Sequence, residues 1–146
     1  MAAIVGKDCM VTLGTSKIIG MGTWKIEGIT TEMHDKSQFC EEFKTYLCGI
    51  KDGGAVSFNG WYDKTDTTGQ TAIRTANLKC SCLTDIRFYL SCTTGGSRWM
   101  PCAVGMTGSG HTASCIRITS WDIGADKGGL VECSFTGTVE GNMELQ

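Results

Sequence analysis

Apolar and polar positions alternate along most of this chain, which is the period of a β-strand with one buried face. In the first third, residues 9–13 and 23–33 are expected to form strands, because Trp24 and Ile26 alternate there with charged residues. Gly20 and Gly22 mark the turn between the two strands. The pattern therefore predicts a chain that begins as β-structure.

The period then changes to that of a helix. Apolar residues at i, i+4, i+7 and i+8 predict an amphipathic helix over residues 37–48. The residues that would form its apolar stripe are Phe39, Phe43, Tyr46 and Leu47. Asp35 or Ser37 is available as the N-cap, and Gly49 as the stop at the C-terminal end. This is the clearest helix pattern in the chain.

After an Asp-Gly-Gly turn at residues 52–54, the strand period returns over residues 56–62. A second, short helix is expected over residues 69–78, with a cap near residues 66–68. Its two inward positions are expected to be Ile73 and Ala76.

The second half of the chain has almost only strand periodicity. We expect strands at residues 86–90, 99–104, 115–121 and 131–140. In the third of these, Ile116 and Ile118 are expected on one face and Trp121 on the other. An Asp-Lys-Gly-Gly sequence before the last strand predicts a hairpin turn.

The outward face of the last two strands carries Thr and Ser. Free strand edges are usually protected by Lys, Pro or bulges, and this face lacks both residue types that would do so. The pattern therefore favours strands that pair with another chain. A solitary β-sandwich whose Thr-rich face meets water fits the same pattern equally well.

The composition supports a single β-rich domain. The chain has 146 residues, including 20 Gly and a single Pro, Pro101. Such a length fits one domain, here residues 1–146, with residues 1–8 expected as a flexible amino-terminal arm. Hydrophobic residues make up 41% of the chain, which argues against disorder.

Charge and apolar runs exclude some classes of partner. The 13 basic and 15 acidic residues give a net charge of -2, whereas tight wrapping of nucleic acid needs a surplus of Lys and Arg. There is no apolar run of about 18 residues, so no membrane span is expected. The amino terminus carries Lys7 and Asp8 where a signal peptide would be apolar, so we expect synthesis in a cytoplasm with reduced thiols.

Candidate chemistry is sparse. His34 and His111 are the only histidines, and no G-x-S-x-G or phosphate-binding glycine motif occurs. None of the nine cysteines forms a C-x-x-C pair, so we expect packing roles, with Cys115 and Cys133 as small apolar residues on the last two strands. We expect no catalytic residue, no cofactor and no metal site.

The order of these segments resembles a known family. Residues 49–54 read Gly-Ile-Lys-Asp-Gly-Gly and lead into the strand sequence A-V-S-F-N-G-W-Y, then into a polar loop and a short helix. Residues 114–145 read as a closing hairpin that ends in F-T-G-T-V-E-G. With the segment from Trp24 to Gln70, this succession is similar to the major tail (tail tube) proteins of long-tailed bacteriophages, over about two-thirds of the chain. The nine cysteines depart from the usual pattern of that family.

The resemblance implies a mainly β fold, a β-sandwich or rolled sheet with a flanking α-helix. It implies hexameric rings stacked head to tail in a virion tail, with strands of the six subunits joining into an inner barrel. The implied partners are other copies of the chain, the tape-measure protein, and the tail-terminator and baseplate proteins. Double-stranded DNA would pass through the channel without specific binding. Type VI and contractile injection systems share this architecture and form an alternative.

A weakly acidic chain suits a DNA channel, because basic residues facing the bore would hold phosphates. We therefore expect channel-lining residues among Glu27, Glu32, Asp35, Asp85, Glu132 and Glu140. The terminal segment and three loops, residues 65–70, 93–97 and 105–111, are expected to change conformation on assembly. The corresponding candidates for contacts between rings are Lys7, Asp8, Thr67, Thr68, Gly95, Gly96 and Ser109.

Two alternatives belong to other functional classes. A free-standing carbohydrate- or protein-binding β-sandwich would use Trp61, Trp99 and Trp121 as exposed aromatic contacts, although burial of these tryptophans in the core is the favoured expectation. A small hydrolase would use Ser109 and His111.

Overall fold

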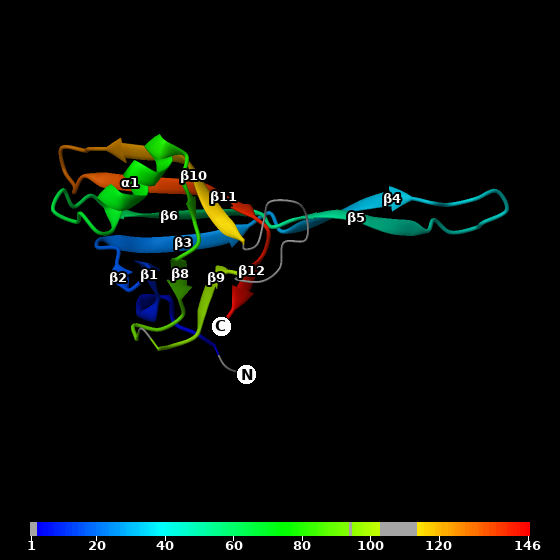
Figure 1. Ribbon diagram of the computed structural model, residues 1–146, viewed down its shortest axis with the longest axis horizontal. Helices are drawn as coiled ribbons and strands as arrows, with labels where there is room; N and C mark the ends of the chain where they lie inside the picture. The colour runs from blue at the N-terminus through cyan, green and yellow to red at the C-terminus, as the bar shows by residue number, and fades with distance from the viewer. Residues whose placement is uncertain (1–2, 94, 103–113) are drawn as a thin grey trace.

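The computed structural model describes residues 3–93, 95–102 and 114–146. Two five-stranded antiparallel sheets form the body of the molecule, and a two-stranded hairpin projects from it (Figure 1). Within these residues there is one α-helix, and a 3-10 helix, η1 (Gly6–Asp8), precedes the first strand.

The first sheet has the strand order β12-β9-β8-β1-β2. Its strands are β1 (Met10–Leu13), β2 (Ser16–Lys17), β8 (Ile86–Tyr89), β9 (Arg98–Pro101) and β12 (Met143–Leu145). β8 is therefore the central strand of this sheet, and the amino-terminal strand β1 lies between β8 and its hairpin partner β2, which forms one edge. The expected strands near residues 9–13, 86–90 and 99–104 are found here, shorter than expected.

The second sheet has the order β3-β6-β11-β10-β7. Its strands are β3 (Met21–Glu27), β6 (Ala55–Trp61), β7 (Cys82–Leu83), β10 (Cys115–Gly124) and β11 (Glu132–Glu140). The last two form the expected hairpin. One facing was predicted wrongly: the register shifts between Ile118 and Ser120, so Trp121 pairs with Phe135 and turns toward the inner side.

The core lies between the two sheets and is aromatic at its centre. The ring of Phe58 on β6 stacks on Phe135 with centroids 5.2 Å apart and meets Phe88 of the opposite sheet edge-on at 5.9 Å. Trp24 adds a further contact with Phe88, at 5.3 Å. These rings and the surrounding buried Ile and Val residues hold the two sheets together.

The helix α1 (Gln70–Lys79) packs beside β10, and its inward residues Ile73 and Ala76 are buried as expected. Its amino-terminal end is held by the buried carboxylate of Asp66, which accepts hydrogen bonds from the backbone N–H groups of Gly69 and Gln70 at 3.1 Å. The Asp66 carboxylate also accepts from Ile19 N–H at 3.0 Å. The cap expected near residues 66–68 is therefore Asp66, and it ties the helix to the start of β3.

The helix expected over residues 37–48 does not form. Residues 30–35 and 46–52 instead pair as β4 (Thr30–Asp35) and β5 (Tyr46–Asp52), joined by a long loop. Cys40, in the middle of the expected helix, has a left-handed backbone with φ of 71°. The apolar residues of the expected stripe have no core to face, and pairing with residues 30–35 draws the segment after Thr45 into a strand.

The thiols also differ from expectation. Cys82 and Cys115 form a disulfide between β7 and β10, where reduced thiols in packing roles were expected. The two cysteines lie 33 positions apart and form no short spacing motif, so the sequence does not indicate this pairing. Cys133 is buried in the core, as expected of a small apolar residue.

Candidate assembly surfaces

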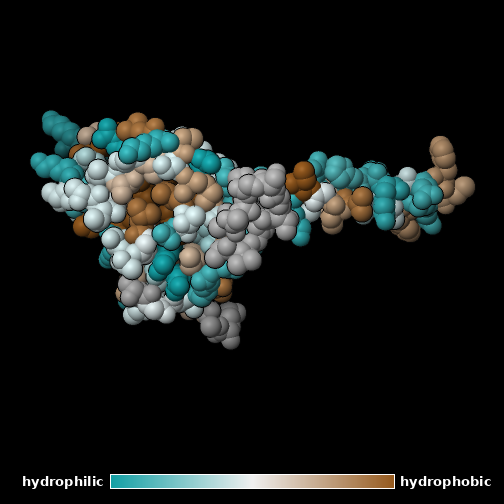
Figure 2. Space-filling view, viewed as in Figure 1, coloured by the Kyte–Doolittle hydropathy of each residue, from teal (hydrophilic) through white to brown (hydrophobic). Residues whose placement is uncertain are grey.

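The β4–β5 hairpin, which we call the arm, is the most unusual surface of the molecule. It extends away from the body, so that its strands contact each other and almost nothing else (Figure 1). Every residue from 28 to 52 is exposed except the half-buried Gly49. Figure 2 shows apolar side chains interspersed with polar ones along the arm and at its tip.

The exposed apolar side chains of the arm are large. Phe39 at the tip is fully exposed, and Ile50 is 81% exposed. The remaining members of this set are Ile29, Met33, Phe43, Tyr46 and Leu47. An isolated two-stranded hairpin is marginally stable in water, and apolar groups of this size are normally covered. The arm therefore has the properties of a surface that is buried against a partner.

Local hydrogen bonds shape the arm where it turns. Asp35 ends β4 and accepts a hydrogen bond from Ser37 N–H at 2.8 Å, while the hydroxyl oxygen of Ser37 accepts one from Thr45 N–H at 2.9 Å. The hydrogen bonds from the side chain and backbone of Ser37 lower the pKa of Asp35. Thus the residues expected to cap a helix instead begin and close the arm loop.

The arm rejoins the body through the Asp-Gly-Gly turn of the sequence motif. The carboxylate of Asp52 accepts a hydrogen bond from Gly54 N–H at 2.9 Å, and Gly54 has φ of +88°. The turn predicted from residues 49–54 is therefore present, but it connects an arm strand to a core strand, β6, where the sequence predicted a connection from a helix.

The outer face of the second sheet is the second candidate surface. Residues that pair across neighbouring strands share one face of the sheet. Glu27 pairs with Ala55, and Ala55 pairs with Thr138 on β11. Since alternate residues of a strand also share a face, Glu27 lies on the same outer face as Glu132 and Glu140. The strand residues between the two glutamates of β11 are Ser134, Thr136 and Thr138. The Thr-rich, Lys-poor face inferred from sequence therefore exists, and it points away from the core.

Two of the three glutamates on this face have basic partners. Lys25 Nζ lies 2.8 Å from Glu27 Oε2, and Arg117 Nε lies 2.6 Å from Glu140 Oε1. Glu132 lies at the opposite end of the sheet, near Asp122, which pairs with Ser134. Asp122 was not among the sequence candidates; the register shift between Ile118 and Ser120 turns it to this face.

The other three channel candidates lie elsewhere. Glu32 and Asp35 are on the arm, where Glu32 Oε1 is 3.7 Å from His34 Nε2. Asp85 is exposed in the turn between β7 and β8. Within one subunit the structure therefore brings together only part of the predicted set, and their placement along a channel stays a prediction.

The candidates for contacts between rings occupy two regions. Lys7 and Asp8 are exposed in η1, and Asp8 O accepts a hydrogen bond from Cys92 Sγ at 3.2 Å, which places η1 beside the loop that contains Gly95 and Gly96. Thr67 and Thr68 are exposed in the loop before α1. Ser109, like His111 and the rest of the 105–111 loop, lies outside the described residues.

The tryptophans are mostly covered. Trp99 and Trp121 are half-buried and pack against the core cluster, and the guanidinium carbon of Arg74 lies 4.9 Å from the Trp121 ring centroid. Only Trp61 of the three candidates is exposed, at 42%. A row of exposed aromatic contacts for a glycan is therefore not present on the described surface.

Within the part of the chain that the structure describes, no helix has the length and apolarity needed to cross a bilayer. No family model and no curated protein sequence matches the chain.

The fold is shared with proteins of tails and tubes. The chain aligns with one from the tail of an empty gene transfer agent particle, refined with C6 symmetry, at a TM-score of 0.70 and 16% identity over 99% of both chains. It aligns with a chain of the PVC sheath–tube complex of an extracellular contractile injection system at 0.65 and 12% identity, over 99% of this chain and 91% of that one. With the SPP1 tail tube the TM-score is 0.59 at 16% identity, over 99% and 79%. The chain thus has the mainly β, tail-tube-like fold that its sequence predicted.

Proposed function

We propose that this chain is the subunit of a tail tube in a long-tailed phage or phage-like particle. In this proposal six copies form a ring, rings stack into a tube in the virion tail, and double-stranded DNA passes through the bore. The chain is a structural protein with no catalytic role. The exposed apolar arm carries the proposal, and the shared tail-tube fold and the C6 symmetry of the gene transfer agent tail support it.

The occupant of the arm's apolar surface is another copy of this chain. A heterologous contact between identical subunits closes into a ring when its rotation permits, and otherwise continues as an open helical filament. Covering side chains as exposed as Phe39, Phe43 and Ile50 gains roughly 1.5–3 kcal/mol each. Their exposure in the single subunit therefore provides a driving force for assembly.

The second sheet supplies the bore in this proposal. β3 lies at one edge of this sheet, and the opposite edge of β10 is covered by β7 over only two residue pairs. Backbone groups along these margins can pair with strands of neighbouring subunits and close an inner barrel. The outer face would then present Thr, Ser and glutamates to the channel, so that passing DNA meets few phosphate-binding groups.

The same tube architecture would serve a contractile injection system, whose PVC complex the chain resembles about as well. The two assemblies differ in what fills the bore. Tape-measure, terminator and baseplate proteins would be the further partners in a phage tail. If particles purified from producing cells carry DNA in a head, the phage-like assignment is favoured.

The proposal is tested by negative-stain microscopy and sedimentation of the purified full-length chain at high concentration. The wild type is expected to form rings and tubes. The double variant Phe43→Ser with Ile50→Ser should stay monomeric, because its arm loses apolar surface. The matched control Phe43→Leu with Ile50→Val keeps that surface and should still assemble.

A wild-type chain that remains monomeric at millimolar concentration would overturn the proposal. A monomer that binds glycans would favour the free-standing binding module instead. Tubes formed equally well by the serine variant would remove the arm from the assembly contact.

A further inference from the structure

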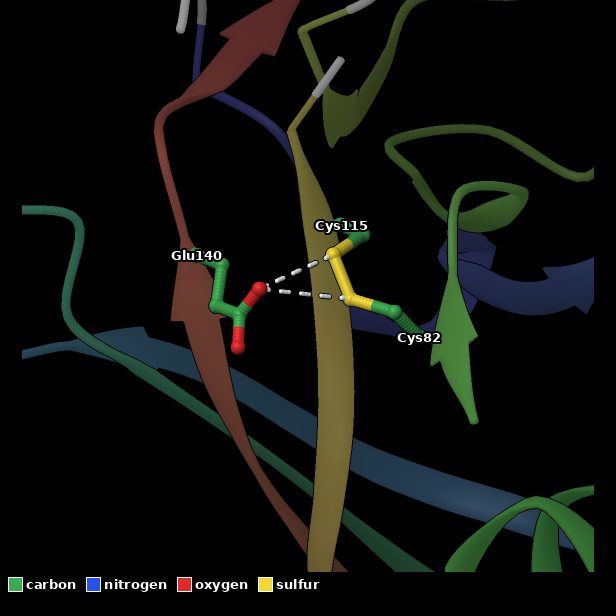
Figure 3. Close-up of side chains that lie close together, drawn as sticks. All are labelled: Cys82, Cys115 and Glu140. Carbon is green, nitrogen blue, oxygen red and sulfur yellow. Dashed lines mark hydrogen bonds between the residues drawn. A yellow bond between two sulfur atoms is a disulfide. The ribbon is translucent and has the colours of Figure 1, made fainter. Parts of the chain in front are cut away.

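Three neighbouring strands bring Cys82, Cys115 and Glu140 to one point on the outer face of the second sheet. Their two sulfur atoms and one carboxylate oxygen all lie within 4.8 Å of one another (Figure 3). The cluster lies at one end of this sheet and does not include the arm. Glu140 also belongs to the face that the tube proposal turns toward the channel, but that proposal assigns no role to the two cysteines.

The sheet register explains why these side chains converge. Cys115 and Glu140 are direct partners on β10 and β11, so their side chains leave the sheet on the same side. Cys82 comes from β7, which pairs with the other edge of β10. Cys115 is buried and the other two are half-buried, so the cluster is partly shielded while solvent still reaches it.

The carboxylate of Glu140 is held in one orientation by Arg117. Arg117 Nε lies 2.6 Å from Glu140 Oε1, and Arg117 Nη1 donates to the carbonyl of Cys80 at 2.6 Å. The other oxygen, Oε2, therefore faces the sulfurs and lies 3.7 Å from Cys82 Sγ and 3.6 Å from Cys115 Sγ. Figure 3 shows this oxygen directed at both sulfurs. Such a hydrogen-bonded outer group is typical of carboxylates that bind metals.

We propose that the reduced form of this cluster is a binding site for a single zinc-type divalent ion. Cys82 Sγ, Cys115 Sγ and Glu140 Oε2 are its ligands, and water takes the fourth tetrahedral position. Two thiolates select a soft or borderline ion over magnesium or calcium. The charges also balance, because two thiolates and a carboxylate meet the divalent ion and the guanidinium of Arg117.

The disulfide is then the oxidised, metal-free form of the same site. Its formation removes two electrons and two protons from the two thiols, and molecular oxygen or a small-molecule disulfide takes up the electrons. A thiol or phosphine reductant reverses the step, and the ion displaces both thiol protons when it binds. Since β7 pairs with β10 over only two residue pairs, either link anchors this short strand to the sheet.

The first test uses the full-length chain reduced with a phosphine and titrated with Co²⁺, followed by displacement with Zn²⁺. The expected result is a thiolate-to-cobalt charge-transfer band that saturates at one ion per chain and disappears when Zn²⁺ is added. Oxidised protein should show no band, because its two ligand sulfurs are bonded to each other. Absence of the band in the reduced wild type, or an equal band in the oxidised protein, would overturn the proposal.

Variants then assign the ligands. Cys82→Ser and Cys115→Ser should each abolish the band, and Glu140→Gln should weaken Zn²⁺ binding by about 10-fold or more. The matched control is Cys48→Ser, which removes an exposed thiol from the arm and should leave binding unchanged. A band that survives in Cys82→Ser would show that other cysteines bind the ion.

A measurement on the wild type avoids any dependence on the folding of variants. Zn²⁺ should slow alkylation of Cys82 and Cys115 in the reduced chain, measured for each cysteine by mass spectrometry, and should leave the alkylation rate of Cys48 unchanged. Equal rates at Cys82 with and without Zn²⁺ would contradict the site.

Discussion

Gly28 and Gly54 face each other at the root of the arm, where a Cβ on Gly28 would lie 3.8 Å from the Cα of Gly54. Both have positive φ, +76° and +88°. Gly28 leads from β3 into β4, and Gly54 leads from β5 into β6, so each arm strand leaves or enters the body through a left-handed residue. The direction of the arm is therefore set by this pair of glycines.

These two glycines should respond differently to substitution. Gly28→Ala has room for the methyl group and bears only the backbone cost of about 1–2 kcal/mol. In Gly54→Ala the methyl group would also collide with the Glu27 carbonyl, for a total of about 2–5 kcal/mol. Urea unfolding of both variants measures the difference, and equal losses would contradict the described arm root.

The Asp66 carboxylate should be essential for docking α1. It accepts hydrogen bonds from Ile19, Gly69 and Gln70 N–H groups and is only 3% exposed, so Asp66→Ala leaves buried donors unsatisfied. We expect a loss of about 3 kcal/mol in the free energy of unfolding. Asp66→Asn keeps one acceptor oxygen and should lose less. Chemical denaturation compares the two, and a neutral Asp66→Ala would refute this role.

The arm loop should loosen in acid. The hydrogen bonds from Ser37 hold the pKa of Asp35 below its ordinary value of 3.8, so their contribution is present above that pH and is lost as the pH falls through the lower, folded value. Ser37→Ala should move the pKa of Asp35 back up toward 3.8, measured by NMR titration of the carboxyl carbon. An unchanged titration would contradict the side-chain hydrogen bond.

A charge reversal tests the channel face. If Glu132 faces the bore, Glu132→Lys should make assembled tubes retain double-stranded DNA in low salt and release it as salt rises. Asp126→Lys makes the same reversal of charge in the β10–β11 turn and serves as the control. Cosedimentation of DNA with tubes measures retention. Equal retention by both variants would argue against a lumenal position for Glu132.

The body of this fold could be predicted because its strands are amphipathic. Apolar and polar residues alternate around Phe58, Phe135 and Ile116, which indicates strands with one buried face. The spacing of Ile73 and Ala76 indicates the inward face of a helix. Trp121 was misplaced because a bulge reverses the facing of every residue after it without changing the local composition.

The arm could not be predicted, because its apolar residues do not join the core cluster formed by the described residues. Spacing from Phe39 to Leu47 fits a helix that packs on a core, but these side chains are exposed and the backbone pairs with residues 30–35. Likewise, the approach of Cys82 to Cys115 depends on the pairing of β7 with β10, which no spacing in the sequence indicates. Of the predicted channel residues, the register places Glu27, Glu132 and Glu140 on one face.

None of the residues from 28 to 53 belongs to the core cluster. Selection for a well-packed interior therefore does not act on the arm, and its sequence and length can drift as long as the partner surface drifts with it. Two lineages that keep the same sandwich can in this way become unable to mix their subunits.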